Sequence, residues 1–327
     1  MNTNEIYSVV KQQILEELPD GLQHATALLN HLTTDGKEKL TGGIYIQTPI
    51  KLIKNASQGF IAGTGGLVDV TPARQLDYAV FNWKYYYVNA NFTLADYNVS
   101  QGSPEAVVNF IEKKTEGAME DAMREIASAL WTGSSAAPLA PEGIADVCAA
   151  SGTAYGGLTD TDYTDDATAW LSDIETATTL DYSLLATMIS KIRGRMKVYS
   201  GNNKMLGLMN EACFSKMLTQ LQGQQIFSED KALVAAGFDN FTVNGTPIAL
   251  DGYATGTQDG ATNDNWVVIF PKKVMKLIYN YGFGNESPFD GEARIPNQPI
   301  MSVQSYMSFN MICNNRRLVS VDKTVIA

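Results

Sequence analysis

The sequence has few of the residue types on which catalytic and metal sites depend. Its 327 residues include two histidines and three cysteines. Neither His24 nor His31 has partners at the spacing of a catalytic triad or a zinc site, and the cysteines, which form no CxxC pair, are typical of buried thiols. The glycine-rich GTGG stretch lacks the GxGxxG spacing of a nucleotide loop. We therefore expect no enzyme activity, no metal and no cofactor.

The sequence also lacks long hydrophobic runs and a balance of charge. No run of about 18 apolar residues occurs, and the segment MNTNEIYSVVKQQILEELPDG carries acidic residues where a signal peptide has basic and then apolar ones. We expect neither a membrane-spanning nor a secreted protein. Only 18% of the residues are charged, the net charge is -11, and no Lys or Arg occurs between Glu125 and Ser190. This distribution argues against a protein that grips nucleic acid along its length.

What the sequence does have is apolar residues, 45% of the total, and one long amphipathic segment. Between Ser103 and Gly133 apolar residues recur at helical spacing, and charged residues occupy much of the remaining surface. Ser103 suits the N-cap, Pro104 the first helical position and Gly133 the stop. We expect a helix of about 45 Å, at about 1.5 Å per residue, that acts as a spine for the chain.

The rest of the chain predicts both helices and strands, so the expected fold class is α+β. DYSLLATMISKIRGRMK predicts a second amphipathic helix, and KMLGLMNEACFSKMLTQL predicts a strand followed by a helix. FTVNGTPIAL predicts a hairpin with a type I′ turn at Asn-Gly. WVVIF, KVMKLIYNY and the segment from Ser302 to Ile326 predict the remaining strands.

The segment LDYAVFNWKYYYVNANFTLADYNV alternates in two registers. Phe81, Trp83, Tyr85 and Tyr87 would share one face of a strand, whereas the apolar residues that follow fall on the opposite face. This switch predicts either an arm that passes from one environment to another or two ordinary strands with a bend near Asn89. The four aromatic residues are candidates for contacts between subunits, although such stripes also occur in cores.

Taken in order, these parts resemble the major capsid protein of tailed bacteriophages, the Hong Kong ninety-seven type of fold. The resemblance rests on an N-terminal arm (residues 1–42), an extended two-stranded β loop (residues 43–102), and a spine helix that ends in Leu130-Trp131-Thr132-Gly133 before a mixed α/β body. The stretch GTAYGGL, followed by Trp170, is similar to a glycine-rich stretch of some phage coat proteins.

The resemblance implies a division of the body into two domains. Residues 103–199, which include the spine helix, and residues 275–327 would form the peripheral domain. Residues 200–274 would form an axial domain, packed around the five-fold and six-fold centres of a shell.

The resemblance also implies a function. The chain would assemble in hexamers and pentamers into the icosahedral head shell of a tailed phage and would enclose its double-stranded DNA genome. The implied location is the virion, after assembly in the cytoplasm of the host bacterium. The implied partners are other copies of the chain, a portal, a separate scaffolding protein, and DNA bound without sequence specificity, with no membrane. Long projecting elements suit this role, because a neighbouring subunit can bury them.

Some relatives join a lysine of the extended loop covalently to an asparagine of a neighbour. Lys51, Lys54 and Lys84 lie in the predicted loop, and we take Lys51 and Lys54 as candidates for contacts between subunits. The reaction needs an amine that has lost its proton, against an ordinary pKa of about 10.4, and a nearby carboxyl group. The sequence does not place these groups together, so we expect a non-covalent shell.

Two other functions stay open at this point. An encapsulin, a cellular nanocompartment shell, shares the fold but encloses enzymes, so the contents of the particle separate it from a phage head. A surface- or carbohydrate-binding β-rich protein is suggested by strands rich in Tyr, Asn and Thr. Such a protein would stay a monomer or a small oligomer, so particle size separates it from both kinds of shell.

Overall fold

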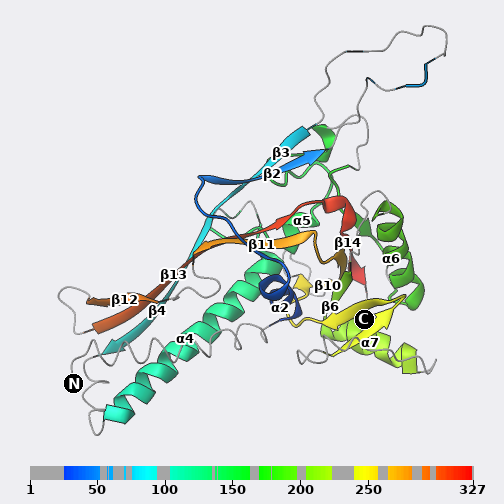
Figure 1. Ribbon diagram of the computed structural model, residues 1–327. Helices are drawn as coiled ribbons and strands as arrows, with labels where there is room; N and C mark the ends of the chain where they lie inside the picture. Colours follow the sequence, from blue (N-terminus) through cyan, green and yellow to red (C-terminus); the bar gives the residue numbers. More distant parts are fainter. Residues whose placement is uncertain are drawn as a thin grey trace.

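The computed structural model shows a long helix, two mixed sheets and a projecting two-stranded hairpin (Figure 1). This mixture of elements confirms the predicted α+β class. The structure describes residues 26–51, 57, 59–61, 70, 76–93, 104–134, 137, 139–162, 169–177, 179–196, 204–222, 239–256, 264–281, 289–294 and 300–325.

The spine helix α4 runs from Pro104 to Thr132, as its sequence predicts. The helix ends at Gly133 because the chain packs too closely there for a side chain, which is a steric requirement and not a matter of helix propensity. A Cβ atom on Gly133 would lie 2.0 Å from the carbonyl oxygen of Pro141, because the chain returns against the end of the helix. The amide of Gly143 then donates a hydrogen bond of 2.9 Å to the carbonyl oxygen of Gly133, which closes the turn.

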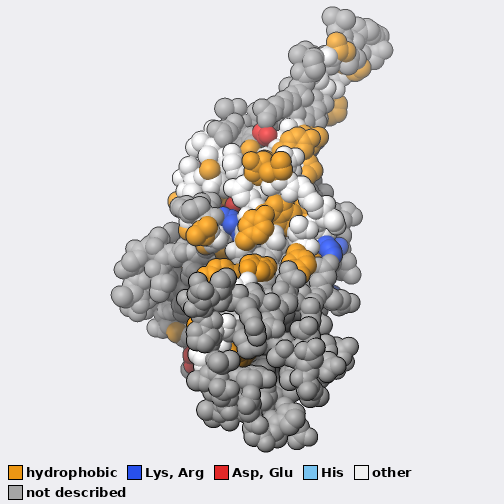
Figure 2. All heavy atoms as spheres, turned by 90° about the vertical axis from the view of Figure 1, so that its left-hand side faces the viewer, with side chains coloured by type: hydrophobic (Ala, Val, Ile, Leu, Met, Phe, Trp, Pro, Cys, Tyr) orange, Lys and Arg blue, Asp and Glu red, His pale blue; other side chains and the backbone are white. Residues whose placement is uncertain are grey.

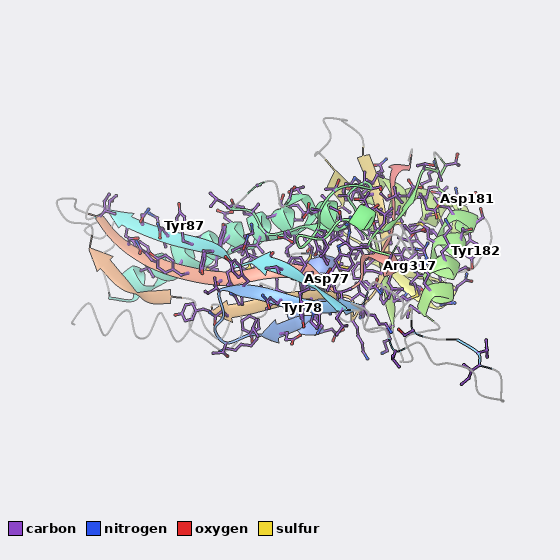
Figure 3. All side chains as sticks on the ribbon, turned by 90° about the horizontal axis from the view of Figure 1, so that it is seen from above. Asp77, Tyr78, Tyr87, Asp181, Tyr182 and Arg317 are labelled. Carbon is purple, nitrogen blue, oxygen red and sulfur yellow. The ribbon has the colours of Figure 1, made fainter. Side chains whose placement is uncertain are left out.

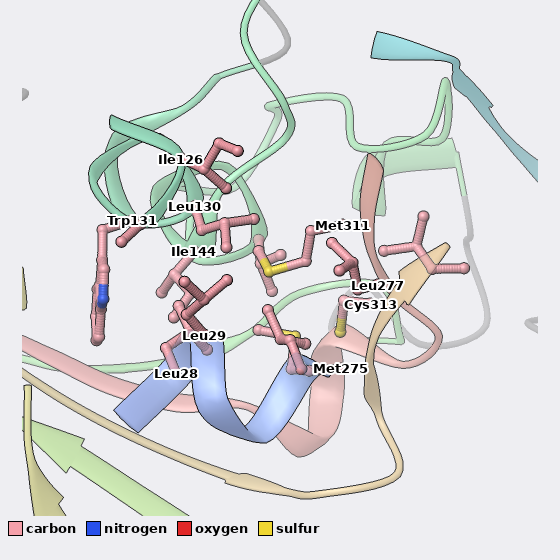
Figure 4. Close-up of a cluster of buried hydrophobic side chains, with 14 of the residues drawn as sticks. Leu28, Leu29, Ile126, Leu130, Trp131, Ile144, Met275, Leu277, Met311 and Cys313 are labelled. Atoms are coloured by element: carbon pink, nitrogen blue, oxygen red, sulfur yellow. The ribbon is translucent and has the colours of Figure 1, made fainter. Parts of the chain in front are cut away.

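The core lies between α4 and a short helix, α2 (Ala27–Thr34). Figure 4 shows Leu28 and Leu29 of α2 beside the α4 side chains, with residues of two strands completing the cluster. Helix α2 belongs to the predicted N-terminal arm, residues 1–42, yet its apolar side chains are buried in its own chain. Helix α2 of the predicted arm is therefore an element of the core. The central residues of the cluster are Leu28, Leu29, Ile126, Leu130, Ile144, Leu277 and Met311.

A five-stranded sheet covers one side of the spine. Its central strand β13 pairs with β4 along one edge and with β11 and β12 along the other, and β1 pairs with β11. The longest of these pairings joins Lys84–Thr93 to Ile300–Phe309, segments more than 200 residues apart in the sequence. The strands are β1 (Lys37–Lys39), β4 (Lys84–Thr93), β11 (Met275–Tyr281), β12 (Phe289–Arg294) and β13 (Ile300–Cys313).

A seven-stranded sheet forms the other end of the molecule, in the order β5-β14-β10-β6-β8-β7, with β9 on β10. Helices α6 (Tyr182–Met196) and α7 (Glu211–Gln222) pack on it and bury a second apolar cluster. Both helices and the β7–β8 hairpin match their predictions, and Asn244 and Gly245 take the positive φ angles of a type I′ turn. The strands are β5 (Asp173–Glu175), β6 (Met205–Met209), β7 (Asn240–Val243), β8 (Thr246–Leu250), β9 (Thr255–Gly256), β10 (Asp264–Pro271) and β14 (Ser320–Val325).

Pairs of strands cross the predicted domain ranges, whose roles in a shell stay a prediction. Strand β10, from the predicted axial range 200–274, pairs with β14 from the range 275–327, and β14 pairs with β5 from the range 103–199. The seven-stranded sheet thus joins all three ranges by hydrogen bonds. Three short helices connect the sheets: α5 (Ile144–Val147), η1 (Asp160–Asp162) and η2 (Arg316–Leu318).

Candidate assembly interface

The hairpin of β2 (Tyr45–Lys51) and β3 (Leu76–Asn82) projects from the body (Figure 1). Its register pairs Ile46 with Phe81 on an inner face that is buried. The loop that contains Gly156 covers this inner face at the root, and the amide of Val80 donates a 2.9 Å hydrogen bond to the Gly156 carbonyl oxygen. A side chain at Gly156 would collide with Ala79 and Phe81, so the close approach requires glycine.

The outer face of the hairpin is apolar and exposed. Leu76 and Tyr78 of β3 are each 54% exposed, and Tyr45 lies on the same face at the other end of the ladder. The aromatic pattern of the residues that follow does not include this face, and the period-two alternation in LDYAVF is the sequence signal that identifies it. We call the exposed apolar residues of this surface the hairpin face: Tyr45, Pro49, Leu76, Tyr78 and Val80.

The chain changes both sheet and register at Trp83. Strand β3 ends at Asn82 in the hairpin, and β4 begins at Lys84 in the five-stranded sheet. The indole N–H of Trp83 donates to the Gly43 carbonyl oxygen at 2.9 Å and fixes the crossing point. The predicted switch is therefore present, but it lies at Trp83 and not near Asn89.

The break divides the four aromatic candidates, so the prediction that they share one face is wrong. Phe81 is 1% exposed and packs edge to face on Tyr155, which places it in the core of its own chain. Trp83 is half-buried, whereas Tyr85 and Tyr87 are 77% and 66% exposed. Odd-numbered side chains point inward in β3 and outward in β4, because the residue between the two strands belongs to neither ladder.

Tyr85 and Tyr87 form an exposed surface with Tyr306, the cross-strand partner of Tyr87. We call these three residues the tyrosine face. Figure 2 shows hydrophobic side chains gathered along this side of the molecule, and Figure 3 marks Tyr78 on the hairpin and Tyr87 on β4. The even-numbered side chains of β4 face α4 instead, where the Tyr86 hydroxyl donates to Glu125 at 2.7 Å. Because α4 occupies the inner side, the outer side is the one open to a partner.

The lysines predicted to lie in the loop have different positions. Lys51 is exposed at the end of β2, and Lys54 lies outside the described residues. Lys84 is buried at the start of β4. Burial raises the pKa of the Glu142 carboxyl group, and the positive charge of Lys84 nearby opposes part of that rise. Within the predicted loop, residues 43–102, β2 and β3 form the projecting hairpin, whereas β4 pairs with β13 in the five-stranded sheet.

The described residues lack two features that would suggest another kind of site. They contain no group of three or more His, Cys, Asp and Glu side chains placed to hold a metal ion. They also contain no helix with the length and apolar character needed to cross a bilayer. Burial raises the pKa of the three cysteine thiols, Cys148, Cys213 and Cys313, so each stays protonated near neutral pH.

No protein-family model matches the chain, and no curated protein matches it. Solved structures do. A chain of the cyanophage A-1(L) capsid aligns with a TM-score of 0.61 and 14% identity, over 91% of this chain and 92% of that chain. The SrpI encapsulin from Synechococcus elongatus aligns with a TM-score of 0.59 and 8% identity, over 89% and 85%. The capsid of a native GTA particle aligns with a TM-score of 0.55 and 9% identity, over 93% and 91%. The chain has the major capsid fold of tailed phages, which is also found in an encapsulin.

Proposed function

We propose that this chain is the subunit of an icosahedral phage head shell that encloses double-stranded DNA. The observation that carries the proposal is the hairpin face, an apolar surface that projects from a capsid fold and that no described residue of the same chain covers. Exposed apolar surfaces of this kind mark sites of protein association. A neighbouring copy in a closed shell is a partner that can bury such a surface at every subunit.

The tyrosine face is the surface we propose for the neighbour's side of this contact. Tyrosine is enriched at protein interfaces because it buries a large ring and keeps a hydroxyl for hydrogen bonding. Tyr85 and Tyr87 are therefore contact residues in this proposal, and Lys51 lies at the edge of the hairpin that docks. Lys54 follows Lys51 in the sequence and keeps its predicted role as a contact candidate. Phe81 and Trp83 act indirectly, by holding the hairpin in position.

The wider assembly follows from the same proposal. The shell is built of hexamers and pentamers, with residues 200–274 near the symmetry axes and residues 103–199 and 275–327 between them. A portal and a separate scaffolding protein complete it, and the DNA inside is held without sequence-specific contacts, as the net charge of -11 favours. Assembly takes place in the bacterial cytoplasm, and the mature location is the virion.

Particle size tests the proposal directly. The purified chain, examined by light scattering and negative-stain microscopy, is expected to form closed particles of uniform size. The double variant Leu76→Ser/Tyr78→Ser should remain unassembled at the same concentration while keeping its circular dichroism spectrum. Gln47→Ser is the matched control, because Gln47 is exposed on the same face and is polar already. The proposal is contradicted if the wild-type chain stays monomeric even in the native source, where its scaffolding protein is present, and this outcome favours a surface-binding protein.

An encapsulin-type shell is the second candidate, and the alignment with the SrpI encapsulin over 89% of this chain favours it. Both candidates predict closed particles, so their contents decide. Particles purified from the native source should contain nuclease-resistant DNA if the chain is a phage head protein. Particles that contain a protein cargo and no DNA would instead identify a cellular compartment.

A further inference from the structure

The root of the hairpin is tied to the body by one buried asparagine. Asn310 of β13 is fully buried, and its side-chain amide donates to the Asn82 carbonyl oxygen at 2.9 Å. Its side-chain oxygen accepts from the backbone amide of Glu142 at 3.1 Å. Asn82 is the last residue of β3, and Glu142 lies in the loop after α4. Any movement of that loop therefore reaches the hairpin through Asn310.

The Glu142 side chain lies in a buried group of charges at this root. Glu142 is 6% exposed, Lys84 of β4 is 6% exposed and Asp146 of α5 is 4% exposed. The hydroxyl group of Tyr155 also interacts electrostatically with Glu142 and Asp146, and the Arg316 guanidinium lies 5.3 Å from the centre of the Tyr155 ring. One carboxyl oxygen of Glu142, Oε2, has no hydrogen-bond partner among the described residues.

Ionising Glu142 in this position is unfavourable for two reasons. A buried carboxylate loses the hydration that stabilises its charge, and the Asp146 carboxylate nearby repels it. Lys84 offsets part of this cost. Burial, with the repulsion from Asp146, raises the pKa of Glu142 to about 7 against an ordinary value of 4.5. The charge of this side chain consequently changes within the neutral pH range.

We propose that Glu142 is a proton-controlled latch on the root of the hairpin, closed when the carboxyl group is protonated and loosened when it is ionised. Ionised Glu142 gains stability if water reaches it, and water can reach it only if the loop around residues 141–143 moves. That movement strains the hydrogen bonds of Asn310 to Glu142 and Asn82. The hairpin is thus held more firmly in mildly acidic than in mildly alkaline solution. This property belongs to the single chain and holds whether or not the chain builds a shell.

Hydrogen exchange of the full-length chain, followed by mass spectrometry at pH 6 and pH 8, tests the latch. Exchange is expressed as protection factors, so that the intrinsic effect of pH on exchange chemistry cancels. Protection of residues 44–51 and 76–82 should fall by up to about tenfold from pH 6 to pH 8, because opening lets Glu142 ionise freely. Glu142→Gln should remove this difference. Glu120→Gln makes the same charge change on an exposed position of α4 and should keep it.

Titration of His31 does not contribute to the difference, since its pKa is lowered to about 4 and it stays neutral between pH 6 and pH 8. Should Glu142→Gln fail to fold, Lys84→Met provides a second test. Removing the cation that favours ionised Glu142 raises the pKa of this carboxyl group further, so the fall in protection from pH 6 to pH 8 must become larger. The proposal is overturned if the wild-type root shows equal protection at both pH values. It is equally overturned if Glu142→Gln keeps the difference or Lys84→Met leaves the size of the fall unchanged.

Discussion

At the scale of single residues, the strand break at Trp83 separates side chains that hold the fold from side chains free to bind. Phe81 fills a site between Tyr155 and Gly156, whereas Tyr85, four residues later, contributes its ring to the surface. We expect Phe81→Ala to lower the free energy of unfolding by about 3–5 kcal/mol, the usual cost of a cavity left by a buried ring.

The double variant Tyr85→Ala/Tyr87→Ala should weaken assembly while leaving the stability of the single chain nearly unchanged. Both rings are mostly exposed in the single chain, so the free energy of unfolding should change by less than about 1 kcal/mol. Assembly should suffer more, since a buried interface aromatic can contribute about 2 kcal/mol or more and the loss recurs at every subunit. Urea denaturation of the monomer and the critical concentration for particle formation separate the two effects. Equal losses in both measurements would place these tyrosines in the core.

His31 gives the fold a dependence on acid pH. Its Nε2 lies 3.0 Å from the Lys272 carbonyl oxygen, and burial, together with the Lys272 charge, lowers its pKa from 6.5 to about 4. Between these values the unfolded chain binds a proton that the folded chain does not. The stability that neutral His31 contributes is therefore complete above pH 6.5 and is lost as the pH falls towards 4.

We expect the wild-type chain to lose roughly 1–2 kcal/mol more stability than His31→Gln between pH 7 and pH 5. Urea midpoints of both proteins at the two pH values measure this difference. Comparing the two proteins removes the contributions of the carboxyl groups, which titrate in both. If the urea midpoints of the two proteins fell equally between pH 7 and pH 5, His31 would not be the group that causes the loss of stability.

At the scale of elements, two glycines of the spine segment test opposite constraints. Apart from the backbone of α4 itself, no heavy atom of the described residues lies within 4 Å of a Cβ built on Gly117, so Gly117→Ala should stabilise α4 by about 1 kcal/mol through helix propensity alone. At Gly133 the Cβ would overlap the Pro141 carbonyl oxygen. Gly133→Ala should therefore destabilise the protein strongly and separate the end of α4 from the loop that carries Glu142. Thermal melting of both variants checks the pair, and a stabilising effect at Gly133 would contradict the close approach.

The elements whose signal is local could be predicted from the sequence. Helices α4, α6 and α7 each bury one stripe at helical spacing, and Asn244-Gly245 specifies its own turn. Strand β4 was harder to interpret, because its partner β13 is distant in the sequence and Asn82 is the only turn-favouring residue beside the break at Trp83. A strand pattern states which residues share a face, but it does not state which face is covered.

The candidate interface was predicted in part for the same reason. Tyr85 and Tyr87 stood out as an aromatic pattern, but the pattern also included Phe81, which only the contact with Tyr155 assigns to the core. The root of the hairpin could not be predicted. Asn310, Glu142 and Lys84 come from three segments, and nothing in the sequence around any of them indicates that they meet.

At the scale of the whole molecule, the surfaces and the lysines together favour a shell held by non-covalent contacts. A lysine can attack an asparagine side chain only if it is neutral, close to the amide and beside a carboxyl group. Lys51 is exposed at the end of β2 and does not lie in a buried, apolar pocket of the described residues. Lys84 does have a carboxyl group nearby, but it is buried within its own chain and cannot reach a neighbour.

We therefore expect mature particles, boiled in detergent and run on a gel, to give a single band near 35.6 kDa. The hairpin face and the tyrosine face, buried repeatedly around the shell, would supply the stability that a covalent bond supplies elsewhere, because the contribution of one weak contact is multiplied by the number of copies. A ladder of multimers would show this expectation wrong. Lys51→Arg would then identify the attacking group, since it keeps the charge and the exposed position but removes the primary amine; loss of the ladder would assign the bond to Lys51.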